Sequence, residues 1–159
     1  MSNPPLPARL RVLPALVPTC ARRLVDIGAG HGALSVHLRA RADVVIATDV
    51  ADGPPDELHR NMDRWGADAI IDVRRGAGFT PIDDGEVDAA VIAGMGAERA
   101  LSIASDAPAK RVRWLLLQCM QRPHLVEPWV AARRWTVHDR VEITQRRHTY
   151  QTWLVEVAA

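Results

Sequence analysis

Short apolar runs alternate with segments of helical spacing along most of this sequence. The runs predict buried strands at residues 24–27, 44–47, 69–73, 87–93 and 112–118. Between them, apolar residues recur three to four positions apart, as an amphipathic helix requires. Helices are therefore expected around Leu34 and Leu38, from the Pro54–Pro55 pair through Leu58, Met62 and Trp65, and over residues 97–105 and 128–134.

The end of the chain has a different pattern. Residues 136–144 and 148–157 are rich in β-branched and aromatic residues, and a polar turn at residues 145–147 joins them, which predicts an antiparallel hairpin. The alternation before it predicts an α/β fold, with a mostly parallel seven-stranded sheet and helices on both faces. We expect residues 1–159 to form a single domain. Ligands bind such sheets at the carboxyl ends of the strands, so the residues after each strand are the functional candidates.

The composition indicates where the protein resides in the cell more clearly than what it does. The net charge is only +1, which neither favours nor excludes nucleic acid, although 19 of the 20 basic residues are arginine. Cys20 and Cys119 are far apart in the sequence and form no Cys-x-x-Cys, which argues against a disulfide framework and a zinc site; two buried free thiols and no metal are expected. The proline-rich N-terminus is unlike a signal peptide, and no apolar run is long enough to span a membrane. A cytoplasmic protein is expected.

The segment "LVDIGAGHGALSVHL" (residues 24–38) carries glycines at alternate positions after the first strand. Such glycines let the backbone turn tightly and approach a ligand. The segment also fits G-x-G-x-x-G/A with Asp49 about 20 residues on, so a nicotinamide dinucleotide stays possible, as does a scaffold without ligand. An acid within the strand, Asp26, instead suits the positive end of S-adenosylmethionine (SAM). Asp49 could accept hydrogen bonds from both ribose hydroxyls; the alternative is a helix-capping role.

The loop after the fourth strand, "VIAGMGAERA", is the candidate acceptor site. Its residues Ala93, Gly94, Met95 and Gly96 stand where a methyl acceptor would approach. Their backbone carbonyls could accept hydrogen bonds from an amino group such as that of adenine. The alternative is an ordinary tight turn between a strand and a helix.

Taken together, these segments resemble the bacterial tRNA adenine-N1-methyltransferases of the TrmK type. "LVDIGAGHGALS" corresponds to the family's DIGSDHAYLP-like motif, and "TDVADGP" to the segment after its second strand. "VRRGAGF" corresponds to its RxGDGL-like segment, "VDAAVIAGMGA" to VDTIVIAGMGG and "LLLQCM" to LILQPN. "RRWTVHDRVEI" and "TYQTWLVE" correspond to its last two strands. The resemblance implies a Rossmann-like class I methyltransferase fold, SAM as cofactor, and transfer of a methyl group to N1 of an adenine in the D arm of tRNA.

The resemblance also implies roles for particular residues. Cofactor binding is expected from Asp26, Gly28, Ala29, Gly30, Asp49, Val50, Gly76, Ala77, Gly78, Ala93 and Gly94. Catalytic roles are expected for Asp26, His31, Ala93, Gly94, Met95 and Gly96, with His31 either orienting the acceptor or simply starting a helix. RNA contact is expected from Arg99 and Arg122, which follow strands at the carboxyl edge of the sheet.

Several motif positions differ from the family. Gly30 and Ala77 replace aspartates, Cys119–Met120 replaces Pro-Asn, and Ala97 replaces a glycine. The family also has a C-terminal helical domain resembling an RNA-binding arm, which is not expected here. Two other functions therefore stay open: a small-molecule methyltransferase, and a non-catalytic module that binds SAM or a partner. The sequence leaves monomer and homodimer open.

Overall fold

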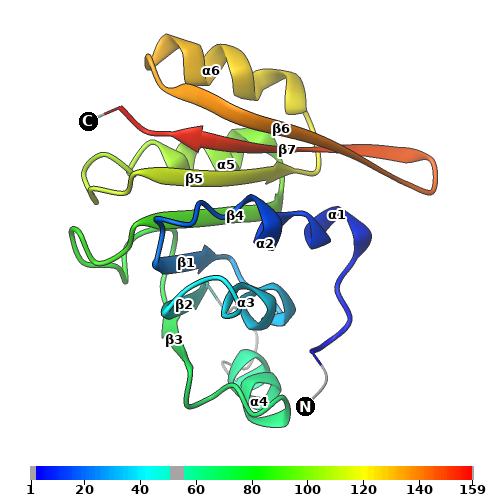
Figure 1. Ribbon diagram of the computed structural model, residues 1–159, viewed down its shortest axis with the longest axis vertical. Coiled ribbons are helices and arrows are strands. Elements are labelled where there is room, and N and C mark those ends of the chain that lie inside the picture. Colours follow the sequence, from blue (N-terminus) through cyan, green and yellow to red (C-terminus); the bar gives the residue numbers. More distant parts are fainter. Residues whose placement is uncertain (1–2, 51–55, 159) are drawn as a thin grey trace.

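The structure is a computed structural model that describes residues 3–50 and 56–158. Its single sheet has the strand order β3-β2-β1-β4-β5-β7-β6 (Figure 1). The strands are β1 (Arg23–Ile27), β2 (Val44–Asp49), β3 (Ile71–Arg75), β4 (Ala89–Met95), β5 (Trp114–Cys119), β6 (Thr136–Gln145) and β7 (His148–Glu156). The helices are α1 (Ala8–Arg11), α2 (Leu13–Leu16), α3 (Ala33–Leu38), α4 (Asp56–Arg64), α5 (Ala97–Ala104), the 3-10 helix η1 (Pro123–Leu125) and α6 (Val126–Ala132).

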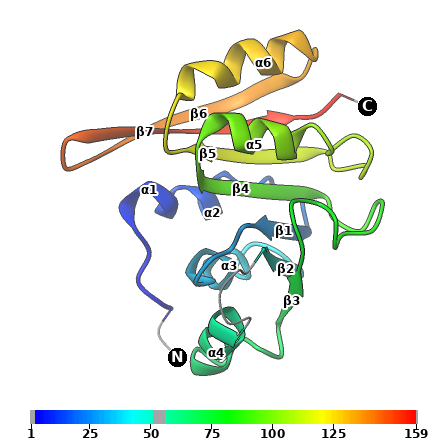
Figure 2. The same ribbon diagram turned by 180° about the vertical axis from the view of Figure 1, so that it is seen from behind.

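Strands β1 to β5 are parallel and lie between two layers of helices. Buried parallel strands read as continuous apolar runs, and all six residues of β5 are buried. One core joins the sheet to α1, α2, α3 and α4, and the other joins it to α5 and α6. Figure 1 shows the α1–α3 face and Figure 2 the α5–α6 face. The predicted α/β fold with helices on both faces is confirmed.

The predicted hairpin is also confirmed. Strand β7 runs antiparallel to β5, and β6 runs antiparallel to β7. The last pair between β5 and β7 is Cys119 with Gln151, whereas β6 and β7 continue pairing to Gln145 and His148. The hairpin therefore projects past the sheet, as both ribbon views show (Figures 1 and 2).

Some predicted boundaries were wrong. The third strand begins at Ile71, because residues 67–70 form a turn that leaves Ile70 half exposed. Helix α6 begins before Pro128, since η1 leads directly into it. Helix α4 ends before Trp65, and its expected Pro54–Pro55 start lies outside the described residues.

Other features near the N-terminus were missed or misjudged. Helices α1 and α2 were not predicted, because four residues each are too few to show helical spacing. The two cysteines are free as expected, but Cys20 is exposed rather than buried. Across the described ranges, no helix is both long and apolar enough to cross a membrane.

Candidate cofactor and acceptor site

The candidate site lies at the carboxyl edge of the parallel strands, around the end of β1. From β1 the chain builds the sheet outward through β2 and β3, then returns to place β4 on the other side of β1. This reversal of direction is the switch point at which open α/β sheets bind ligands. The carboxyl ends of β1, β2, β3 and β4 all lie along this edge, because the four strands are parallel.

The glycine loop after β1 requires glycine for two separate reasons. Gly28, Gly30 and Gly32 have φ of 71°, 56° and 84°, in the left-handed region that side chains disfavour. At Gly32 a side chain would also lack space, because its Cβ would lie 2.1 Å from Met62 Cε on α4. At Gly30 a Cβ would meet nothing within 4 Å. The loop is thus packed on its α4 side and open at Gly30, where a ligand could approach the backbone.

Asp49 joins this loop to the end of β2. The backbone N–H of Gly30 donates to its Oδ2 at 2.6 Å, and the N–H of Val50 donates to its Oδ1 at 2.6 Å. Each carboxylate oxygen accepts one of these bonds and keeps a further lone pair. The carboxylate is therefore fixed in place and can still accept bonds from two hydroxyl groups. The side chain of Val50 is exposed beside it and offers an apolar surface.

Asp26 lies inside the molecule rather than on the acceptor side. Its side chain is buried, and Ser35 Oγ on α3 donates to its Oδ2 at 2.6 Å. Burial raises the pKa of Asp26 to about 6; the hydrogen bond from Ser35 lowers this pKa, and the charge of Asp49 raises it. A direct contact between this carboxylate and an acceptor would require it to point outward, and the structure places it against α3 instead.

The end of β4 is held by a glutamine that the sequence prediction overlooked. The predicted loop was partly wrong, because Ala93, Gly94 and Met95 belong to the strand, with a register shift between Ala93 and Met95, and Gly96 follows it. Gly94 has φ +80°, and its N–H donates to Gln118 Oε1 at 3.0 Å. Arg9 Nη1, from α1, donates to the same oxygen at 3.2 Å. Gln118 is completely buried in β5. A single amide in the apolar run "LLLQC" was the available signal, because a buried amide needs partners.

The first and fourth loops meet at Met95. A Cβ on Gly28 would lie 3.2 Å from Met95 Cε, a tight contact that a shift of the methionine side-chain end by a few tenths of an ångström would relieve. Gly96 then serves as N-cap of α5, and the N–H of Ala97 donates to the carbonyl of Gln121 at 3.0 Å. The predicted cofactor loop and the predicted acceptor loop are therefore adjacent.

The loop after β3 closes the same edge. The N–H of Gly76 donates to the carbonyl of Asp49 at 3.0 Å. A Cβ on Gly76 would lie 2.7 Å from Pro81, and Gly78 has φ +53°. Ala77 is exposed between them, and its methyl side chain cannot accept a hydrogen bond. Any polar contact to a ligand at this position must come from the backbone.

Comparison with known proteins agrees with this arrangement. The family described as "Methyltransferase domain" matches residues 6–153. The chain belongs to this methyltransferase family. It is 29% identical to the tRNA (adenine(22)-N(1))-methyltransferase of Bacillus subtilis (strain 168), over 98% of this chain and 67% of that protein. The predicted resemblance to the TrmK type is confirmed.

Solved structures give the same result. The crystal structure of the B. subtilis M1A22 tRNA methyltransferase TrmK has a TM-score of 0.86 and 28% identity, covering 97% of this chain and 67% of that one. A Streptococcus agalactiae protein of the NADB-Rossmann superfamily has a TM-score of 0.86 and 28% identity, covering 98% and 70%. M. capricolum TrmK with S-adenosyl-homocysteine shares the fold, with a TM-score of 0.83 and 18% identity over 95% and 68%.

The remaining predicted site residues of this methyltransferase lie around the two loops. His31 is exposed on the α4 side, where its Nδ1 lies 2.9 Å from Glu57 Oε1 and its carbonyl accepts a bond from Asn61 at 3.0 Å. Arg122, after β5, forms an ion pair with Glu98 on α5. Arg99 is exposed on α5.

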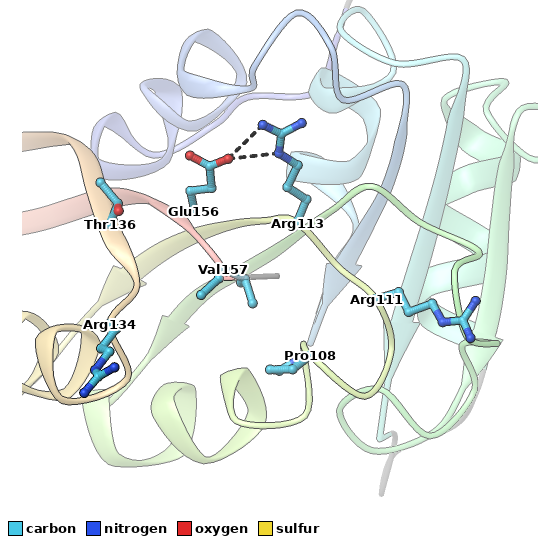
Figure 3. A pocket seen from close by; sticks show the side chains of 8 residues that line it. Pro108, Arg111, Arg113, Arg134, Thr136, Glu156 and Val157 are labelled. Atoms are coloured by element: carbon cyan, nitrogen blue, oxygen red, sulfur yellow. Dashed lines mark hydrogen bonds and ion pairs between the residues drawn. The ribbon is translucent and has the colours of Figure 1, made fainter.

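The hollow drawn in Figure 3 belongs to the opposite edge of the sheet. It has a volume of about 630 Å³ and is lined where β5 and β6 begin and β7 ends. Arg113 and Glu156 pair with each other there at 2.8 Å, while Arg111 and Arg134 point away from that pair (Figure 3). Its charges therefore do not converge on a ligand. Within residues 3–50 and 56–158, no three histidine, cysteine, aspartate or glutamate residues group as a metal site requires.

Proposed function

We propose that this protein uses SAM to methylate N1 of an adenine in tRNA. The observation that carries the proposal is the junction of the glycine loop, Asp49 and the "IAGMG" loop at one edge of the sheet. The relatives named as tRNA adenine-N1 methyltransferases support the acceptor, and those crystallised with SAM or S-adenosyl-homocysteine support the cofactor. Such a reaction belongs in the cytoplasm, where tRNA is modified.

The residues of the site fit SAM. Gly30 leaves open space above the loop, where the cofactor's amino-acid portion would approach the backbone. Asp49 would hold the ribose hydroxyls, because its carboxylate is already oriented by two backbone amides. Val50, Ala77 and Gly78 would enclose the adenine, with Val50 providing apolar contact.

SAM supplies, when bound, a methyl group made electrophilic by its sulfonium. N1 of adenine carries a free lone pair, so this chain needs no general base; it needs to align the acceptor, which can contribute several kcal/mol. The fixed loop of Gly94, Met95 and Gly96 would provide that alignment through its backbone groups. Methylation leaves a positive charge on the acceptor, which nearby carbonyls stabilise. The buried Asp26 would act from inside, by supporting the glycine loop.

Calorimetric titration with SAM tests the cofactor, and Asp49→Ala tests the site. The variant removes a charged acceptor, so the free energy of SAM binding should weaken by about 1–3 kcal/mol, which is about a 5- to 150-fold loss of affinity. Asp43→Ala is the matched control, because Asp43 is an exposed aspartate just before the other end of β2, paired with Arg22. Equal effects of both variants would contradict the assignment of Asp49.

The acceptor is tested with labelled SAM and unmodified bulk tRNA, followed by digestion and detection of 1-methyladenosine. Free adenosine and AMP are the parallel substrates. Methylation of tRNA alone supports the proposal. Methylation of the small molecules alone would favour a small-molecule enzyme, and SAM binding without turnover on any substrate would favour a non-catalytic module. Loss of turnover would be explained by Ala77 and Cys119–Met120, which replace the residues found at these motif positions in the family.

A further inference from the structure

The tip of the β6–β7 hairpin overhangs the edge of the sheet that carries the site. Strand β6 runs in the same direction as β5, so its end and the turn that follows lie at the carboxyl edge. Residues 143–150 continue past the last pair of β5 and, among the described strands, pair with each other across the hairpin alone. Figures 1 and 2 show this projection beside α1.

The tip is basic and has no acidic residue. Residues 143–150 read "ITQRRHTY", with Arg146, Arg147 and His148 all exposed. The nearest acid, Glu142, already accepts bonds from Arg140 at 3.0 Å and Gln151 at 3.2 Å. In the part of the chain that the structure describes, Arg146 and Arg147 form no ion pair. Their charges are therefore available to a ligand.

The turn holds the backbone of Arg146 in a conformation that is unfavourable for arginine. Arg146 has φ +58°, a conformation that glycine or asparagine adopts at lower cost. Backbone strain of this kind tends to persist where a side chain has a function. Arg111, Arg122 and Arg134 share this positive φ, so the missing acid, rather than the backbone conformation, distinguishes the Arg146–Arg147 turn.

A line of cationic and aromatic side chains connects this tip to the acceptor loop. His148 and Tyr150 lie on one face of β7, with ring centroids 6.2 Å apart. The guanidinium of Arg9 lies 6.0 Å from the Tyr150 ring centroid, and Arg9 also binds the glutamine that fixes Gly94. The surface formed by Arg9, Tyr150, His148, Arg147 and Arg146, here termed the hairpin surface, thus begins at the acceptor loop and leads away from it.

We propose that the hairpin surface binds the RNA strand that flanks the acceptor nucleotide. Arginines contact phosphates in a bidentate manner, and aromatic rings stack on unpaired bases, which is how proteins bind RNA loops. This inference rests on the proposed function, since it requires an RNA acceptor. Under this proposal, RNA is bound by residues of the hairpin and α1 in addition to Arg99 and Arg122.

The test compares two double variants of equal charge change. Arg146→Asn/Arg147→Asn, the tip variant, removes the two positive charges of the hairpin tip. Asparagine tolerates the left-handed conformation at position 146. Arg111→Asn/Arg134→Asn is the control: both arginines have left-handed φ (57° and 58°) and lie at the opposite edge. Binding of labelled tRNA is measured by fluorescence across a salt series, alongside SAM affinity and steady-state methylation of tRNA.

The tip variant should bind tRNA about tenfold more weakly and flatten the log–log salt slope by about 1.5, as for two lost phosphate contacts. Its KM for tRNA should rise while kcat and SAM affinity stay unchanged, and the control should match the wild type. Tyr150→Ala should weaken binding where Tyr150→Phe does not. Wild-type affinity and slope in the tip variant, with tRNA methylation intact, would overturn the hairpin surface alone. No tRNA binding or methylation by the wild type, with SAM bound, would overturn it together with the proposed function.

Discussion

Asp26 should make the folded state less stable at neutral pH than at acidic pH. Its pKa rises from 3.8 to about 6 on folding, because burial penalises the carboxylate. Below about pH 4 the group is protonated in both states and costs nothing. Above pH 6 it is ionised in both, and the folded protein must hold a buried charge. The folded state binds the extra proton between these values, so the free energy of unfolding falls as pH rises through this window.

The size of the effect follows from the two pKa values. Each pH unit between them corresponds to about 1.4 kcal/mol, so the full cost of ionising Asp26 is about 3 kcal/mol. Asp26→Asn removes the titration but keeps an oxygen that can accept the bond from Ser35. The free energy of unfolding of this variant, relative to wild type, should therefore improve by about 2–3 kcal/mol between pH 4 and 7.5. Any constant loss from the unpaired amide cancels in that comparison.

Urea denaturation followed by tryptophan fluorescence at several pH values gives this difference directly. Asp43→Asn is the control of opposite sign, because the hydrogen bond and charge of Arg22 lower the pKa of Asp43. That variant should lose relative stability as pH rises through the acidic range. A flat difference for Asp26→Asn from pH 4 to 7.5 would show that the carboxyl group is solvated in the folded protein, and the buried Asp26–Ser35 pair would be wrong.

Three further predictions use matched pairs or a single group. Gly32→Ala should destabilise the fold by about 1–2 kcal/mol more than Gly30→Ala in urea denaturation, because both have left-handed φ but only Gly32 lacks space; equal losses would contradict the packing against α4. Gln118→Leu should cost about 1 kcal/mol by removing the oxygen that accepts from the Gly94 N–H and Arg9 Nη1. Thr152→Val, across the strand pair, should be neutral or stabilising because its buried hydroxyl has no partner among the described residues; the reverse order would contradict the bonding at Gly94. Burial raises the pKa of Cys119 to about 11, so a thiol reagent at pH 8 should titrate one cysteine in the folded protein and two in urea; two fast thiols would contradict its burial.

The fold was predictable because its determinants are local. A strand buried on both faces is mostly apolar, so the runs of β1, β4 and β5 are visible in the sequence without any partner, even though β1 contains Asp26 and β5 contains Gln118. The boundary at Ile70 was missed because the turn at residues 67–70 has no apolar pattern of its own. Helices α1 and α2 were missed because each is short. Their sequences show no spacing, and they are held by packing against the sheet.

The candidate site also has features that follow from local sequence and features that depend on tertiary contacts. The glycine loop, Asp49 and the "IAGMG" segment could be placed from sequence, because each lies at or just after the end of a strand and β1 lies between β2 and β4 in the sheet. The orientation of Asp26 could not, since a residue within a strand faces either layer of helices and only the docking of α3 decides which. The bond between Arg9 and Gln118 joins residues 109 positions apart, so no local pattern contains it. Yet this bond fixes the acceptor loop and places a cation beside Tyr150 at the start of the hairpin surface. Under the proposed function, the residues that set the approach of the acceptor come from the first helix and the last two strands, which lie on opposite sides of the glycine motif in the sequence.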